Sequence, residues 1–152
     1  MKIVFAVIFA VSLAVVFFLL DLSPRSPAET LRDGYYTAEE ADYYLGWKEY
    51  LTLYVSNGKI VNCEYDAKNA SGFIKSWDMD YMRRMNEDCK NYPDKFARNY
   101  VYRLLSNQSS SGIDAMSGAT ESHRSFVKLA DAALAQALAG DHEVVFVEVE
   151  HN

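Results

Sequence analysis

The sequence predicts an α+β domain in which an antiparallel sheet, with a β-hairpin at its centre, packs against helices. Two alternating apolar runs joined by Asn57-Gly58 predict the hairpin. Three later segments carry apolar residues at helical spacing. Half of the 152 residues are hydrophobic, which is enough for one buried core. We therefore expect one globular domain.

The chain opens with an apolar run, from Ile3 to Leu20, that is interrupted only by Ser12. Its length matches a membrane-spanning helix of about 20 residues. A secretory signal peptide is the alternative, but its apolar region is usually about 7 to 15 residues long and ends at a small-x-small cleavage site. We predict a membrane anchor over residues 1–22, a proline-containing linker over 23–32 and one domain over 33–152.

The hairpin is the clearest local signal. Trp47 to Val55 alternates with period two, Asn57-Gly58 is a favoured type I′ turn, and Lys59 to Tyr65 alternates again. Across the turn Val55 would face Ile60 and Tyr54 would face Val61, so both faces of the hairpin carry apolar side chains. This predicts that the hairpin lies within a larger sheet.

Helices are predicted after the hairpin, followed by a last strand. Their ranges are Trp77 to Lys90, Pro93 to Leu105 and Glu121 to Ala139, and the strand covers Val144 to Val149. Ser76 is expected to cap the first helix, and Gly140 to end the last. Methionines recur at helical spacing in the first helix, and such a stripe usually packs in a core. Contact between Met82, or a neighbouring residue, and a ligand ring is the alternative.

The segment from Asp114 to Thr120, DAMSGAT, precedes the last predicted helix and is the best candidate for chemistry. Gly118 allows a tight turn, and the free N–H groups of the following helix favour an anion such as phosphate. The hydroxyls of Ser117, Thr120 and Ser122 can donate hydrogen bonds to it. From the residues alone, an ordinary helix cap at Ser117 or Thr120 is the simpler alternative.

The string DAMSGAT resembles the flavinylation motif of the FMN-binding domain family: Asp, two variable residues, Ser or Thr, Gly, Ala, Thr. Every fixed position is matched. The family includes the C subunit of the sodium-pumping NADH:quinone oxidoreductase, the G subunit of its Rnf relative and stand-alone extracytoplasmic flavoproteins. Its last threonine carries FMN through a phosphoester, which implies FMN on Thr120. Scaffold segments also resemble the family: Asp33-Gly34-Tyr35-Tyr36, Gly46-Trp47-Lys48, Asn57-Gly58-Lys59-Ile60 and Tyr65-Asp66.

The resemblance implies a cofactor site and its partners. The residues it assigns to FMN binding are Asp114, Met116, Ser117, Gly118, Ala119 and Thr120. By position, Trp77, Tyr81 and Met116 are candidates for covering the flavin ring. A separate flavin transferase would use FAD as the donor and supply the metal, so no metal ligand and no catalytic residue is assigned here. We expect an electron carrier, rather than a stand-alone enzyme, that works with redox partners in or at the membrane.

Two other functions stay open. The domain could bind FMN or a related phosphate ligand without a covalent bond, or it could be an anchored structural or assembly protein that has lost the cofactor. Nucleic acid is not expected as a partner, because 15 Lys and Arg against 21 Asp and Glu give a net charge of −6. The same acidity predicts a low flavin redox potential.

The remaining expectations concern location and cysteines. The positive-inside rule nearly balances across the apolar run, so only the resemblance implies that the domain lies on the extracytoplasmic side, held to membrane lipid by its N-terminal helix. Cys63 and Cys89 have a spacing unlike that of zinc sites. Whether they form a disulfide is left open.

Overall fold

The computed structural model describes residues 30–151 of the chain. The predicted anchor over residues 1–22 and the greater part of the linker over 23–32 therefore lie outside the described residues. From residue 30 to residue 151, no helix has both the length and the apolar composition that crossing a bilayer requires.

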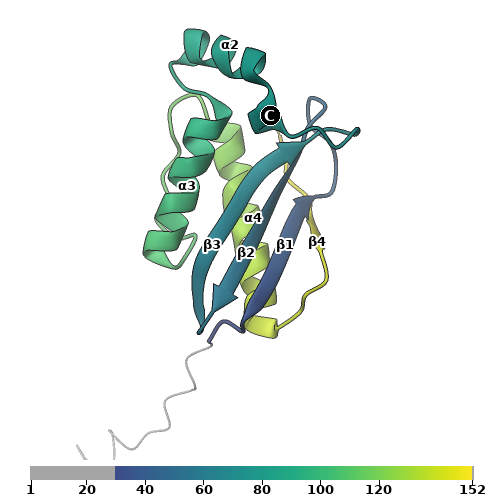
Figure 1. Ribbon diagram of the computed structural model, residues 1–152, viewed down its shortest axis with the longest axis vertical. Coiled ribbons are helices and arrows are strands. Elements are labelled where there is room, and N and C mark those ends of the chain that lie inside the picture. Colours follow the sequence, from purple (N-terminus) through teal and green to yellow (C-terminus); the bar gives the residue numbers. More distant parts are fainter. Residues whose placement is uncertain (1–29, 152) are drawn as a thin grey trace, which may run out of the picture.

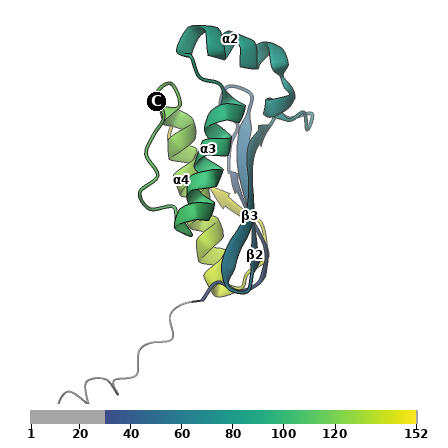
Figure 2. The same cartoon turned by 60° about the vertical axis from the view of Figure 1, so that its left-hand side comes forward.

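Within the described residues three strands come first, the helices follow, and a fourth strand comes last. The strands are β1 (Gly34–Glu40), β2 (Lys48–Ser56), β3 (Lys59–Lys68) and β4 (Val145–Val147), and the helices are the 3₁₀ turn η1 (Lys75–Trp77), α2 (Met79–Cys89), α3 (Pro93–Asn107) and α4 (Thr120–Ala139). Within the described residues the strands form one sheet in the order β3-β2-β1-β4. Helices α3 and α4 cover one face of it, as Figures 1 and 2 show.

The sheet is mixed, so the α+β class is confirmed but the prediction of an antiparallel sheet is wrong. The β1–β2 and β2–β3 pairs are antiparallel, whereas β4 pairs with β1 in parallel. The reason lies in α4. Ser125 near its start donates to Glu40 at the end of β1, and Ala137 near its end accepts from the N–H of Arg32, just before β1. Because α4 runs against β1, the strand that follows it returns alongside β1.

The hairpin has the predicted turn and an unpredicted bulge. Asn57 and Gly58 have φ values of 53° and 70°, as a type I′ turn requires. The register shifts next to Tyr54, which lies opposite Asn62. The predicted pairing of Val55 with Ile60 is confirmed, whereas that of Tyr54 with Val61 is wrong, and Val61 is 50% exposed. The hairpin does lie within a larger sheet, with β2 inside and β3 at the edge.

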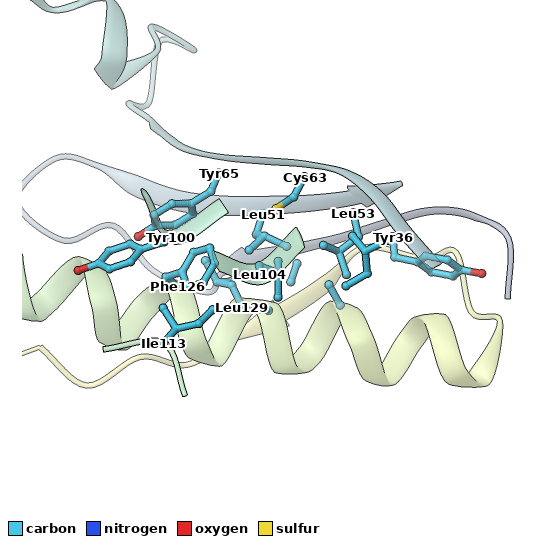
Figure 3. Packing of buried hydrophobic residues seen from close by; sticks show 14 of the residues in the cluster. Tyr36, Leu51, Leu53, Cys63, Tyr65, Tyr100, Leu104, Ile113, Phe126 and Leu129 are labelled. Atoms are coloured by element: carbon cyan, nitrogen blue, oxygen red, sulfur yellow. The ribbon is translucent and has the colours of Figure 1, made fainter. Parts of the chain in front are cut away.

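The core fills the space between the sheet and α3 and α4 (Figure 3). Its largest fully buried side chains include Tyr36, Leu51, Leu53, Tyr100, Leu104, Phe126 and Leu129. Alanines at 130, 133 and 137 are also fully buried, which lets α4 lie close against β1 and β2. On the opposite face the Tyr35 and Tyr54 rings stack on each other, 4.6 Å apart.

The helix predicted over Trp77 to Lys90 begins later than expected. The chain bends at Asp78, between η1 and α2, and the Asp78 carboxylate caps α2 by accepting from the N–H of Tyr81 at 2.9 Å. Ser76 is therefore not the cap. The methionine stripe is not core either, since only Met82 is buried and Met79 is 63% exposed. Helix α2 lies beyond the end of the sheet and packs on α3, so a single side of it meets the domain (Figure 2).

Candidate functional site

The glycine of the DAMSGAT segment has the conformation that the sequence predicts. Gly118 has φ +74°, a region that side chains with a Cβ rarely adopt, and a Cβ there would lie 3.1 Å from that of Cys89. The backbone conformation therefore favours glycine, and a Cβ there would also crowd the side chain of Cys89. The turn delivers Thr120 as the first residue of α4, one position earlier than predicted.

Buried side chains from α3 and from the α2–α3 connection hold this segment in place. The hydroxyl of Tyr100 accepts from the N–H of Met116 at 3.1 Å and donates to the carbonyl of Ala119 at 3.3 Å. The amide of Asn91 donates to the carbonyl of Ser117 at 2.9 Å. Tyr100 and Asn91 are both buried. The position of Thr120 therefore depends on the core as well as on its own helix.

Replacing Tyr100 with Phe tests this dependence. The substitution leaves the N–H of Met116 and the carbonyl of Ala119 without their partner, and the expected loss is about 1–3 kcal/mol of unfolding free energy. Urea denaturation followed by circular dichroism measures it. Tyr102→Phe is the matched control on the same helix, because Tyr102 is 69% exposed and should cost almost nothing. Equal losses in the two variants would show that the hydroxyl does not support the segment.

Thr120 lies on the wall of a cavity of about 480 Å³, which we call the Thr120 cavity. The start of α4, the start of β2, η1 and α2 enclose it, and the lining residues used below are Glu40, Tyr44, Trp47, Glu49, Lys75, Tyr81, Gly118, Ala119, Thr120, Glu121, Ser122 and His151. This volume lies in the range of ligand sites. The elements that enclose it lie at the end of the domain opposite residue 30 (Figure 1).

The structure brings only part of the predicted site together. Gly118, Ala119, Thr120 and Tyr81 line the cavity, whereas Asp114, Met116, Ser117 and Trp77 are not among its lining residues. Of the methionines on α2, Met85 lines the cavity and Met82 does not. Asp114 points to solvent, with Arg103 at 3.6 Å, and Met116 packs against the core. Trp77 is 67% exposed, with its ring edge-on to Phe73.

No side chain caps the start of α4, whose N-cap residue is Ala119. The alternative that Ser117 or Thr120 is an ordinary cap is therefore wrong. The first N–H groups of a helix have no partner within it, and here they adjoin the Thr120 cavity. Together with the helix dipole they favour an anion at that place, and a phosphate group fits it.

Aromatic rings and one lysine line the same cavity as this anion site. Trp47 and Tyr81 both line it, and the Nζ atom of Lys75 lies 5.6 Å from each of their ring centroids. Such rings can cover a planar ligand, and the ammonium group can meet its negative charge. The sequence pointed to Tyr81 only, because Trp47 was assigned to the scaffold and Lys75 to no role.

Two glutamates, Glu40 and Glu49, also line the cavity, and the sequence predicted no role for either. Glu49 accepts hydrogen bonds from the hydroxyls of Tyr65 and, at 3.2 Å, Ser122. Burial raises the pKa of Glu49 to about 7, and the positive charge of Lys75 opposes this rise. Glu40 is 2% exposed and accepts from the N–H of Glu49 at 2.9 Å. The sequence did contain a signal for them. In the alternating pattern of their strands, both residues fall on the side that faces the core.

The C-terminal segment closes one side of the cavity. His151 stacks on Tyr44 with ring centroids 4.0 Å apart, and its Nε2 atom lies 3.3 Å from Glu40. Glu40 also accepts from the hydroxyl of Ser125 at 2.8 Å. These contacts fix Glu40 between the sheet, α4 and the C-terminal segment.

The cysteines are free thiols, which answers the question left open by the sequence. Cys63 is buried on β3, and burial raises its pKa to about 12, so it packs as a small apolar residue. Cys89 is exposed at the end of α2, next to Gly118. Among the residues that the structure describes, no three His, Cys, Asp or Glu side chains gather in an arrangement that could hold a metal ion.

The fold and the site define a class of protein: an α+β domain that presents a threonine hydroxyl and an uncapped helix start to a cavity suited to a planar, phosphorylated ligand. The model of the FMN-binding domain family matches residues 46–135. This match covers more than half of the chain and includes the DAMSGAT segment. The chain belongs to the FMN-binding domain family, and FMN is its cofactor.

The chain is also similar to two known proteins. The 15 kDa lipoprotein of Treponema pallidum (strain Nichols) is 33% identical over 117 residues, which cover 76% of this chain and 83% of that protein. The crystal structure of the CPE2226 protein from Clostridium perfringens has a TM-score of 0.75 and 35% sequence identity, covering 79% of this chain and 99% of that one. The resemblance found in the sequence is thereby confirmed.

Proposed function

We propose that this protein carries FMN covalently on the Oγ1 atom of Thr120 and relays electrons on the extracytoplasmic side of a membrane. One observation carries the proposal: the hydroxyl-bearing Thr120 and the uncapped start of α4 lie on the wall of a cavity that Trp47 and Tyr81 also line. A phosphate bonded to Thr120 would meet the free N–H groups of the helix. The rings across the cavity can then cover the flavin.

The attachment is a phosphoryl transfer from FAD. The Oγ1 atom of Thr120 forms a bond to the phosphorus of the FMN half, the bond from that phosphorus to the bridging oxygen breaks, and AMP leaves. The hydroxyl proton passes to a base of the flavin transferase. Thr120 is exposed, so a separate enzyme can reach it.

The bound cofactor supplies one-electron and two-electron chemistry, and the chain supplies its position and surroundings. No group on the chain has to take part in bond making with a second substrate, so the protein acts as a carrier rather than as a stand-alone enzyme. A covalent link keeps the flavin from being lost outside the cytoplasm, where it is not replaced.

The acidic floor of the cavity favours a low redox potential. Glu40, Glu49 and Glu121 all line it. Negative charge disfavours the addition of electrons to a nearby flavin. We expect the midpoint potential of the bound flavin to lie below that of free FMN, as measured by spectroelectrochemical titration of the flavinylated protein. A potential well above that of free FMN would contradict the carrier role proposed here.

We place the domain outside the cytoplasm, held by residues 1–22. The apolar run from Ile3 to Leu20 supports an anchor, and the similar protein of Treponema pallidum is named a lipoprotein. The described domain begins at the end away from the elements that enclose the Thr120 cavity (Figure 1). We expect a flexible linker over 23–32 to let the domain bring this cavity to redox partners in or at the membrane.

Co-expression with a flavin transferase tests the proposal. We expect the full chain, extracted from membranes and denatured, to fluoresce in a gel as a flavoprotein, and its intact mass to exceed that of the polypeptide by one FMN less one water. Flavin that is released on denaturation would favour a non-covalent binding module instead. Colourless protein from cells that contain the transferase would favour a structural or assembly role.

A further inference from the structure

We propose that Glu49 is the proton-exchange residue of the Thr120 cavity: its carboxylate takes up a proton from solvent when the bound cofactor is reduced, and releases it on reoxidation. The inference rests on the proposed function, because it requires a redox cofactor in this cavity. It concerns a group to which neither the flavinylation motif nor the sequence assigned any role.

The hydrogen-bond geometry around Glu49 allows a proton on its carboxyl group. The hydroxyl of Tyr65 lies within hydrogen-bond distance of two acceptors, the Oε2 atom of Glu49 and, at 2.8 Å, the carbonyl oxygen of Ser122. One hydroxyl proton cannot serve both acceptors. Both contacts are satisfied when Glu49 is protonated, because the carboxyl group then donates to Tyr65 and Tyr65 donates to Ser122. In the ionised state Tyr65 donates to Glu49 instead.

Charged and titratable groups face Glu49 from every element packed against it. They are Glu40 on β1, Tyr65 on β3, Lys75 on η1, Tyr81 on α2, Tyr100 on α3, Glu121 on α4 and His151 in the C-terminal segment. Burial raises the pKa of Glu49 to about 7, the positive charge of Lys75 lowers it and the charge of Glu40 raises it. Glu49 therefore keeps its proton below about pH 7 and loses it above, so it is poised to respond at neutral pH.

Solvent can reach the carboxyl group. Glu49 lines the Thr120 cavity and also a second hollow of about 370 Å³ between β3 and α3, and Lys75 and Ser122 line both. Glu49 as a residue is half-buried, while its carboxyl group is desolvated enough to raise its pKa. A proton can therefore enter beside Lys75 without passing through the core.

The coupling needs no direct contact with the cofactor. Electrons delivered by a reduced electron-donor protein add negative charge to the cavity, and a like charge nearby favours the protonated form of a carboxyl group. The step balances as one proton from water forming one O–H bond at Oε2 of Glu49, with no protein bond broken. The proton that Glu49 gains offsets the negative charge that the electrons add. The other acidic groups that line the cavity cannot supply positive charge to do so.

The pH dependence of the midpoint potential tests the proposal in the flavinylated full chain. Spectroelectrochemical titration from pH 5 to pH 9 should show a steeper fall around pH 7 in the wild type than in Glu49→Gln, whose amide cannot titrate. Flavin ionisation is common to both proteins, so the difference isolates Glu49. Lys75→Met should move this feature to higher pH, since it removes a positive charge that lowers the pKa of Glu49. Identical profiles in the wild type and Glu49→Gln would overturn the proposal.

The matched control is Glu143→Gln, which removes an exposed acidic side chain near the opposite end of α4 and should leave the profile unchanged. A second measurement needs no flavin. In the Thr120→Ala protein, ¹³C NMR should find one glutamate carboxyl that titrates near pH 7 and that disappears in the Thr120→Ala/Glu49→Gln variant. If flavin fails to attach to the wild type, the proposed function fails while this resonance still reports on Glu49. If no such resonance is found in a flavin-free protein, the proton-exchange proposal fails by itself.

Discussion

Thr120→Ala is expected to abolish covalent flavin completely and to leave the fold intact. Alanine has no hydroxyl to bond to phosphorus, and the exposed hydroxyl of Thr120 is the one on the first residue of α4, beside the uncapped N–H groups. Ala is also a good helix former, so the unfolding free energy should change by no more than about 0.5 kcal/mol. In-gel fluorescence after denaturation and intact-mass analysis measure the loss.

Two controls sharpen this result. Thr120→Ser keeps a hydroxyl at the same atom position and should retain flavin, with a lower yield. Ser111→Ala removes an exposed hydroxyl from the loop before the motif and should match the wild type. Fluorescence that survives in Thr120→Ala would mean that FMN is attached elsewhere, and Ser117 would be the next position to test.

Phe126→Ala is expected to cause the largest loss of stability, about 3–5 kcal/mol of unfolding free energy. Phe126 is fully buried, and its ring packs edge-on to Tyr65 at 5.0 Å and against Tyr100 at 5.2 Å between centroids. Those two tyrosines hold Glu49 and the motif segment. The truncation should therefore also lower the yield of flavinylation, because Thr120 is presented less uniformly. Urea denaturation and fluorescence per mole of protein measure the two effects.

Two controls for Phe126→Ala separate the loss of buried volume from the loss of a phenylalanine as such. Phe126→Leu keeps most of the buried volume and should lose less than about 1.5 kcal/mol. Phe146→Ala removes an exposed phenylalanine whose ring centroid lies 5.0 Å from the ammonium group of Lys48, and should cost at most about 1 kcal/mol. A loss in Phe126→Ala no larger than in Phe146→Ala would show that the core does not depend on this ring.

Local features of the structure were predictable because short-range sterics determine them. Asn57-Gly58 folds as a type I′ turn, Gly140 ends α4 in the left-handed conformation, and Gly118 turns the chain at Thr120. Each depends on which φ values a residue tolerates, which neighbours in the sequence largely decide. The family followed from the same short segment, whose fixed positions suffice for recognition.

The predictions that failed concern residues far apart in the chain. The methionine stripe of α2 has helical spacing, yet it is mostly exposed because the helix lies past the end of the sheet. The parallel direction of β4 follows from where α4 ends, which no pattern within Val145–Val147 reveals. The bulge at Val61 likewise depends on how β3 meets β2.

By itself, the sequence determined the attachment candidate, the hairpin and the helices, because those depend on residues within a few positions of one another. Only the tertiary structure decided which side chains surround Thr120. Trp47 and Glu49 at the start of β2 meet Lys75 of η1 there, because β2, η1 and α4 come together at one end of the domain. The alternating pattern of β2 shows that Glu49 faces the core side of the strand. Its proposed role depends on the cavity, which exists only once the chain has folded.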